Sequence, residues 1–142
     1  MVKFNVGKEN LHIILKIEPI VSEFKLLGVE FDYQLIMNIA VHECVISASW
    51  KLKSILRTRR FFNSAELIRM FKTHILSFIE SRSPAFSHAS TSILQPLDDV
   101  LKKFLKDLGI SFKDAILHFN LAPLSTRRDI ATLGIIHRAI LR

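Results

Sequence analysis

The sequence predicts a mainly α-helical protein, a bundle of about five helices preceded by a short β-hairpin. Beyond residue 33, apolar residues recur at the three- and four-residue intervals of amphipathic helices. The segment 33–60 contains neither glycine nor proline, the two residues that break helices most strongly. Residues 1–32 lack this periodicity and are rich in β-branched and aromatic residues, which favours strands.

Two short strands are expected within residues 1–32. The first is "LHIILKIEPI" and the second is "FKLLGVEFD", which runs from Phe24 to Asp32. Pro19 separates them and Gly28 interrupts the second, because proline and glycine weaken strand interiors. The remaining residues, 33–142, are expected to form the helical part of the chain.

The first helix is predicted from Tyr33 to about Arg60. At 100° per residue its polar residues fall within a sector of about 100°; they are Asn38, His42, Ser49, Lys53, Arg57 and Arg60. Most other positions are apolar, Trp50 included, so this helix is expected to be buried over most of its girth. Its exposed stripe becomes basic toward the C-terminal end.

Capping signals mark the next helices. Asn63 and Glu66 have the spacing of a capping box, although Ser64 is an alternative cap. The helix that follows is expected to end before Pro84. A third helix carries one apolar face and stops at Gly109; this face comprises Ile93, Leu94, Leu97, Val100, Leu101, Phe104, Leu105 and Leu108.

Two shorter segments complete the helical part. Ser111 and Asp114 repeat the capping spacing and predict a short fourth helix that ends near Phe119. Ser125 is expected to cap a last helix that reaches the C-terminus, with apolar positions at Ile130, Leu133, Ile136, Ile140 and Leu141.

Composition limits the function classes. The 142 residues suit a single domain, and 20 Lys and Arg against 13 Asp and Glu give a net charge of +7. Such an excess attracts phosphate-rich partners, although many soluble basic domains bind no nucleic acid. Cys44 is the only cysteine, so neither an intramolecular disulfide nor a zinc cluster is expected. We expect no cofactor, no membrane span, no secretory signal and an intracellular location.

Few residues suggest catalysis. The sequence contains no G-x-S-x-G motif and no glycine-rich phosphate loop. Asp98 and Asp99 are adjacent carboxylates, as in two-metal sites, but the pattern favours a solvated helix face beside Lys102 and Lys103. Cys44 lies among apolar neighbours and is expected to be a small core residue.

The segment "KLKSILRTRRFF", Lys51 to Phe62, is the strongest local signal. Its five cations without an acid predict contacts with about three to five phosphates; they are Lys51, Lys53, Arg57, Arg59 and Arg60. Lys72 is a further candidate. Cations at a helix C-terminus also favour the helix dipole, but five exceed that need.

A second basic pair, Arg127 and Arg128, falls in the first turn of the last helix, the unfavourable end for cations. A partner or Asp129 would offset that cost. Alternatively, the two arginines form a surface pair with no role, and the sequence favours neither interpretation.

In its order of elements the chain resembles the end of the palm and the thumb of reverse transcriptases from non-LTR retrotransposons. The resemblance rests on "FKLLGVEFD", the long helix, "LRTRRFF" and "LIRMFKTHILSFIESRSPAFSHAS", and covers about residues 10–95. Ser83, Pro84 and Phe86 match a Ser-Pro-aromatic segment of the family. Residues 96–142 look similar to a helical extension after the thumb.

The resemblance implies that residues 1–32 are the remnant of a palm-like sheet and 33–142 a thumb-like domain with its extension. The thumb would bind the backbone of an RNA–DNA or DNA duplex. The primer-grip-like residues would be Phe24, Lys25, Leu26, Leu27 and Gly28. The location would be the nucleus if the chain belongs to a retroelement.

The family's catalytic aromatic-x-Asp-Asp turn precedes the Leu-Gly strand, and the 23 residues before Phe24 contain no Asp. The chain alone is therefore expected not to be an enzyme. Its partner would be the missing palm and fingers, or another protein, at an apolar face around Phe4, Ile13, Ile14, Leu26 and Val29.

Three alternatives remain. The chain is a stand-alone helical protein-interaction module, a non-functional retroelement gene fragment, or a small DNA-binding protein that uses the same helices differently. No recognition-helix signature supports the third.

Overall fold

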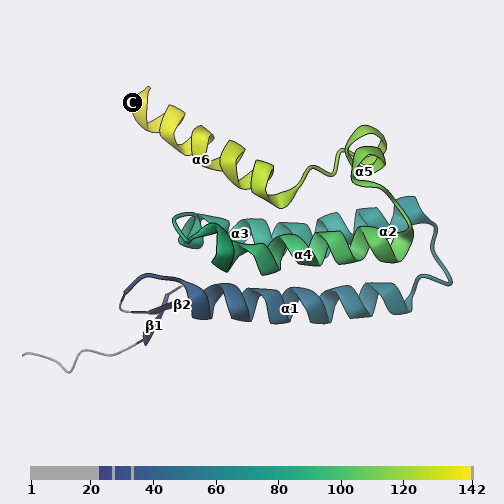
Figure 1. Cartoon of the computed structure of the whole chain (residues 1–142), viewed down its shortest axis with the longest axis horizontal. Coiled ribbons are helices and arrows are strands. Elements are labelled where there is room, and N and C mark those ends of the chain that lie inside the picture. The colour runs from purple at the N-terminus through teal and green to yellow at the C-terminus, as the bar shows by residue number, and fades with distance from the viewer. Residues whose placement is uncertain (1–22, 27, 33, 142) are drawn as a thin grey trace, which may run out of the picture.

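The computed structural model describes residues 23–26, 28–32 and 34–141, which form a two-stranded hairpin and five helical rods (Figure 1). The strands are β1 (Glu23–Leu26) and β2 (Val29–Asp32). The first two rods are α1 (Asn38–Arg57) and a continuous helix made of α2 (Ser64–Phe71), the π-helical turn η1 (Lys72–Leu76) and α3 (Ser77–Phe86). The other three are α4 (Thr91–Leu108), α5 (Phe112–Phe119) and α6 (Leu124–Ile140). The predicted fold class, mainly helical with a preceding hairpin, is confirmed.

Except for Glu23, the hairpin lies within the stretch from Phe24 to Asp32 that the sequence predicts to be a single strand. β1 and β2 pair antiparallel, with Phe24 opposite Phe31 and Lys25 opposite Glu30. Gly28 has a φ of 79°, which a short hairpin connection requires and which side chains disfavour. A Cβ at Gly28 would meet nothing within 4 Å, so its dihedral angle, not close packing, explains the glycine. The other predicted strand, "LHIILKIEPI", lies outside the described residues.

Helix α1 begins five residues later than predicted because the chain first makes a turn. Leu35 and Met37 have φ values of 54° and 66°, which are incompatible with a right-handed helix. Asp32 stabilises this turn: its carbonyl accepts from Leu35 N at 3.0 Å and its Oδ1 accepts from Met37 N at 3.2 Å.

One stripe of α1 faces the core; it comprises Ala40, Val41, Cys44, Ala48, Leu52 and Ile55. The other side faces solvent, where Ile46 is 44% exposed and Trp50 is 62% exposed. The prediction that this helix is buried over most of its girth is therefore wrong. Apolar residues outnumber the positions that a single core-facing stripe can cover.

The second rod begins as predicted but ends later. Asn63 and Glu66 form the capping box, with both hydrogen bonds at 2.9 Å. Pro84 lies inside α3, so the predicted end before it is wrong. The helix continues through Pro84 to Phe86, whose side chain is completely buried. Burial of a phenylalanine offsets much of the cost of proline in a helix.

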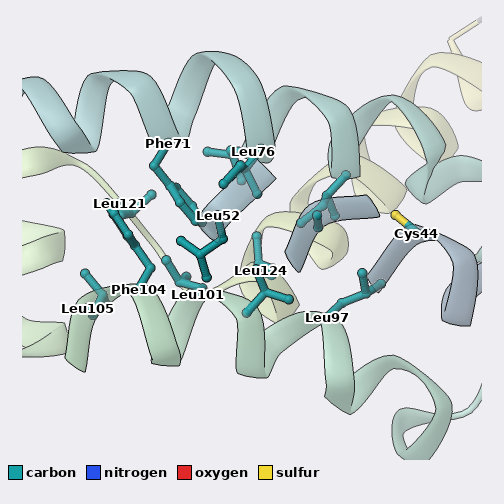
Figure 2. Packing of buried hydrophobic residues seen from close by; sticks show 14 of the residues in the cluster. Cys44, Leu52, Phe71, Leu76, Leu97, Leu101, Phe104, Leu105, Leu121 and Leu124 are labelled. Carbon is teal, nitrogen blue, oxygen red and sulfur yellow. The ribbon is translucent and has the colours of Figure 1, made fainter. Parts of the chain in front are cut away.

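The core lies between α1, α4 and the second rod. Helix α4 contributes the predicted apolar face and ends at Gly109, which has a φ of 68°. Phe71 and Phe104 stack at the centre with ring centroids 4.3 Å apart, and Leu121 lies beside them (Figure 2). Leu121 and Leu124, which flank the start of α6, are buried and close one side of the core.

The predicted start of α5 is confirmed, since Ser111 Oγ accepts from Asp114 N at 3.1 Å. Helix α6 begins at Leu124 after the N-cap Pro123, so Ser125 lies inside the helix and the prediction that it caps this helix is wrong. In Figure 1, α6 runs obliquely away from α3 and α4 toward the C-terminus. Leu124 is the only buried residue of α6. Beyond it α6 exposes large aliphatic side chains, namely Ile130, Leu133, Ile135, Ile136 and Ile140. Among the described helices, none has the length and apolar content to cross a membrane.

Phe104→Ala is expected to lower the free energy of unfolding by about 3–5 kcal/mol, because it removes a buried, stacked ring. Leu117→Ala is the control, since Leu117 is 67% exposed and should change stability by less than about 0.5 kcal/mol. Urea unfolding followed by circular dichroism measures both. Equal losses in the two variants would contradict this core.

Cys44 is expected to be unreactive in the folded protein at pH 8. Burial raises the pKa of its thiol from 9.0 to about 11, an effect that the charge of Arg82 partly opposes. A raised pKa favours the folded state below pH 9, and this contribution is lost as pH rises toward 11. Thiol titration with Ellman's reagent should therefore require urea; rapid labelling without urea would show that Cys44 is accessible.

Candidate nucleic-acid interface

Four of the six predicted phosphate-contact residues gather where α1 ends. Lys53 and Arg57 lie on the solvent side of α1, and Arg59 and Arg60 lie in the turn that joins α1 to α2. All four side chains are exposed. Within the described residues, no carboxylate lies within 4 Å of any of them. We call these four residues the basic end.

Hydrogen bonds fix the turn that carries Arg59 and Arg60. Thr58 donates twice to the Ile55 carbonyl, from its N–H at 3.0 Å and from its hydroxyl at 2.7 Å. Phe61 N donates to the Thr58 carbonyl at 2.9 Å, and the Asn63 capping box begins two residues later. The two arginines therefore lie on a short segment that is held at both ends.

Exposed aromatic side chains accompany the basic end, and Trp50 and Phe61 are the most exposed of them. Trp50 is 62% exposed, although the apolar pattern predicted a buried residue, and the Lys53 ammonium lies 4.9 Å from its ring centroid. Phe61 is 82% exposed and follows the arginines directly. In the sequence, Phe61 stands outside every periodic apolar segment, and this position could have marked it as an exposed residue.

The other two candidates make structural contacts. The Lys51 ammonium lies 4.9 Å from the ring centroid of Phe78, a ring that Arg82 also approaches, to 4.0 Å. Lys72 Nζ donates to the Phe119 carbonyl at the C-terminal end of α5. Lys51 therefore joins α1 to α3, and Lys72 holds α5 against the second rod.

The primer-grip-like residues lie at the opposite end of α1 from the basic end (Figure 1). Phe24 stacks on Phe31 at 5.2 Å, Lys25 pairs with Glu30 at 3.5 Å, and Leu26 is 55% exposed. Gly28 lies in the hairpin connection, and Leu27 is outside the described residues. The twenty residues of α1 span about 30 Å. A duplex that contacted both ends of α1 would have to lie along the helix for roughly nine base pairs.

Asp98 and Asp99 have different partners. Asp98 accepts two hydrogen bonds from Arg128, at 2.9 and 3.0 Å, in a pair whose side chains are only 18% and 11% exposed. Asp99 accepts from Lys102 and Gln95, both at 3.0 Å, and these bonds lower its pKa. The predicted solvated face is thus correct for Asp99 and wrong for Asp98.

Arg127 and Arg128 anchor α6 to the bundle. Arg127 pairs with Glu80 of α3, and Arg128 pairs with Asp98 of α4. Partners on other helices, and not Asp129, therefore offset the unfavourable position of these cations at a helix N-terminus. The sequence could not reveal them, because they lie 47 and 30 residues away in the chain.

A groove of about 400 Å³ lies between α3 and residues 124–135 of α6. Its walls are largely apolar and include Ile79, Pro84, Leu124 and Ile135, with the Glu80–Arg127 pair at its margin. In the described part of the chain, no three His, Cys, Asp or Glu side chains form a group that could hold a metal ion.

Comparisons of the chain with protein-family models, with curated proteins and with solved structures found no match.

Asp98→Ala is expected to loosen α6, because it leaves the poorly exposed Arg128 without its carboxylate. Amide hydrogen exchange in the first turns of α6 should accelerate by roughly tenfold or more, which corresponds to the loss of about 1.5–3 kcal/mol for a charged hydrogen bond. Asp99→Ala is the matched control, since it removes only a surface pair. Equal exchange in both variants would show that the Asp98–Arg128 pair does not hold α6.

Proposed function

We propose that this chain is the thumb-like, duplex-binding module of a reverse-transcriptase-like protein. Its basic end contacts the sugar–phosphate backbone of an RNA–DNA or DNA duplex and does not read base sequence. The observation that carries the proposal is the set of four exposed cations without a carboxylate partner, on the last turns of α1 and on a turn held by hydrogen bonds.

Helix stabilisation does not account for these cations. Arg57 is the only one of them in the last turn of α1, where a cation favours the helix dipole. Thr58 already donates to a carbonyl at the end of α1. Arg59 and Arg60 lie beyond the helix, so they are free to neutralise phosphates.

The role within a polymerase rests on the resemblance of residues 10–95 to the reverse transcriptase palm and thumb. We propose that the chain alone does not polymerise DNA, because the family's aromatic-x-Asp-Asp turn has no counterpart before Phe24. Asp98 and Asp99 engage different partners on different sides of α4, which supports a structural role for this pair.

A protein-interaction module is the second candidate function. The aliphatic side chains that α6 exposes favour it, since a soluble helix normally buries such residues. On the apolar face predicted near the hairpin, Leu26 is exposed, but Val29 packs partly against the core. Phe4, Ile13 and Ile14 lie outside the described residues. A non-functional gene fragment, another of the alternatives, predicts no selective binding at either place.

The wild-type chain is expected to bind an RNA–DNA hybrid duplex with an affinity that falls steeply as salt rises. Changing Arg57, Arg59 and Arg60 together to Gln should lower the slope of log K against log salt by about 2.7, since each phosphate contact contributes about 0.9. Fluorescence anisotropy over a salt series measures the slope.

The control replaces Lys103, Lys106 and Lys113 with Gln, because these exposed residues of α4 and α5 give the same change in net charge. It should leave most of the slope intact. If the wild type shows no salt-dependent binding, or if both triple variants lose the same slope, the basic end is not a duplex site.

A further inference from the structure

Phe61 is the most exposed aromatic side chain in the described part of the chain, at 82%. Most phenylalanine rings stabilise the fold by being buried, and a ring that stays in water contributes no such stabilisation. The ring cannot simply turn into the core, because the Thr58–Phe61 hydrogen bond and the Asn63 cap fix the backbone on both sides. The fold therefore holds this ring out in solvent.

The charges around Phe61 restrict what can cover it. Arg59 and Arg60 precede it directly, and neither has a carboxylate partner within the described residues. An aliphatic surface would strip water from these guanidinium groups without replacing it. A nucleic acid offers both phosphates for the arginines and a flat base for the ring.

We propose that Phe61 stacks on an exposed base at the end of a duplex or at the junction with a single strand. Bases inside a continuous duplex have no free face, whereas a terminal or unpaired base has one. The module would then prefer ends and junctions to uninterrupted duplex. This inference rests on the proposed backbone binding and adds the class of structure that the same site selects.

Trp50 is the other strongly exposed aromatic near the basic end, but it is a poorer platform. The Lys53 ammonium lies 4.9 Å from its ring centroid, so one face is already in use. No such cation contact involves Phe61 among the described residues. Phe61 is therefore the residue to test.

The test compares two DNA ligands of the same sequence: a covalently closed duplex circle, which has no ends, and a linear duplex with a single-stranded overhang. The wild type should bind the overhang ligand about tenfold more tightly per site, the size expected for stacking on one base.

Phe61→Ala should lose this preference but keep the salt dependence, and Phe61→Trp should keep both. Leu133→Ala on α6 controls for loss of an exposed apolar side chain.

A 2-aminopurine at the first unpaired position reports stacking directly. Its fluorescence should change when the wild type or Phe61→Trp binds and should not change with Phe61→Ala. If the wild type binds both ligands equally, or if Phe61→Ala keeps the preference, stacking is wrong while backbone binding stands. If neither ligand binds in a salt-dependent manner, the stacking proposal falls, and the salt series with the RNA–DNA hybrid duplex decides whether backbone binding falls with it.

Discussion

The stripe that α1 buries determines which of its side chains remain free to bind another molecule. Small residues on this stripe, Ala48 and Cys44 among them, are buried in the core that α1 forms with α4 and the second rod. Because a helix presents its residues at fixed angles, burial of that stripe forces Trp50, Lys53 and Arg57 to the solvent side. The same packing directs Lys51 toward Phe78. The candidate interface is thus a consequence of how the core forms.

Local signals predicted much of this fold, and long-range contacts explain most of what they missed. The Asn63 capping box, the apolar face of α4, the Gly109 stop and the Ser111 cap depend on neighbouring residues, so the sequence alone could reveal them. The continuation through Pro84 depends on the burial of Phe86, and the contact of Lys72 depends on Phe119, 47 residues away. The spacing of neighbouring residues in the sequence does not reveal such distant contacts. For the candidate site, the sequence predicts the basic segment itself. Only the packing of the helices shows that Lys51 contacts Phe78 while Lys53 stays on the solvent side.

Net charge is a weak guide to the site in this protein. Several cations serve the fold: Lys51 and Arg82 approach Phe78, Lys72 bonds to a helix end, and Arg127 and Arg128 anchor α6. The basic end differs because its four exposed cations lie close together in the sequence at the end of α1 and in the turn after it, with no carboxylate partner in the described chain. The local excess of cations over carboxylates at a rigid turn therefore supports phosphate binding there. The overall net charge of +7 does not identify the site.

The most direct measurement is a titration of the isotope-labelled chain with an RNA–DNA hybrid duplex at low salt, followed by amide and arginine side-chain NMR signals. We expect the largest shifts on Lys53 and on residues 57–61, while Lys72 and the second half of α6 remain unchanged. Shifts confined to the hairpin or to α6, or no shifts at all, would contradict it.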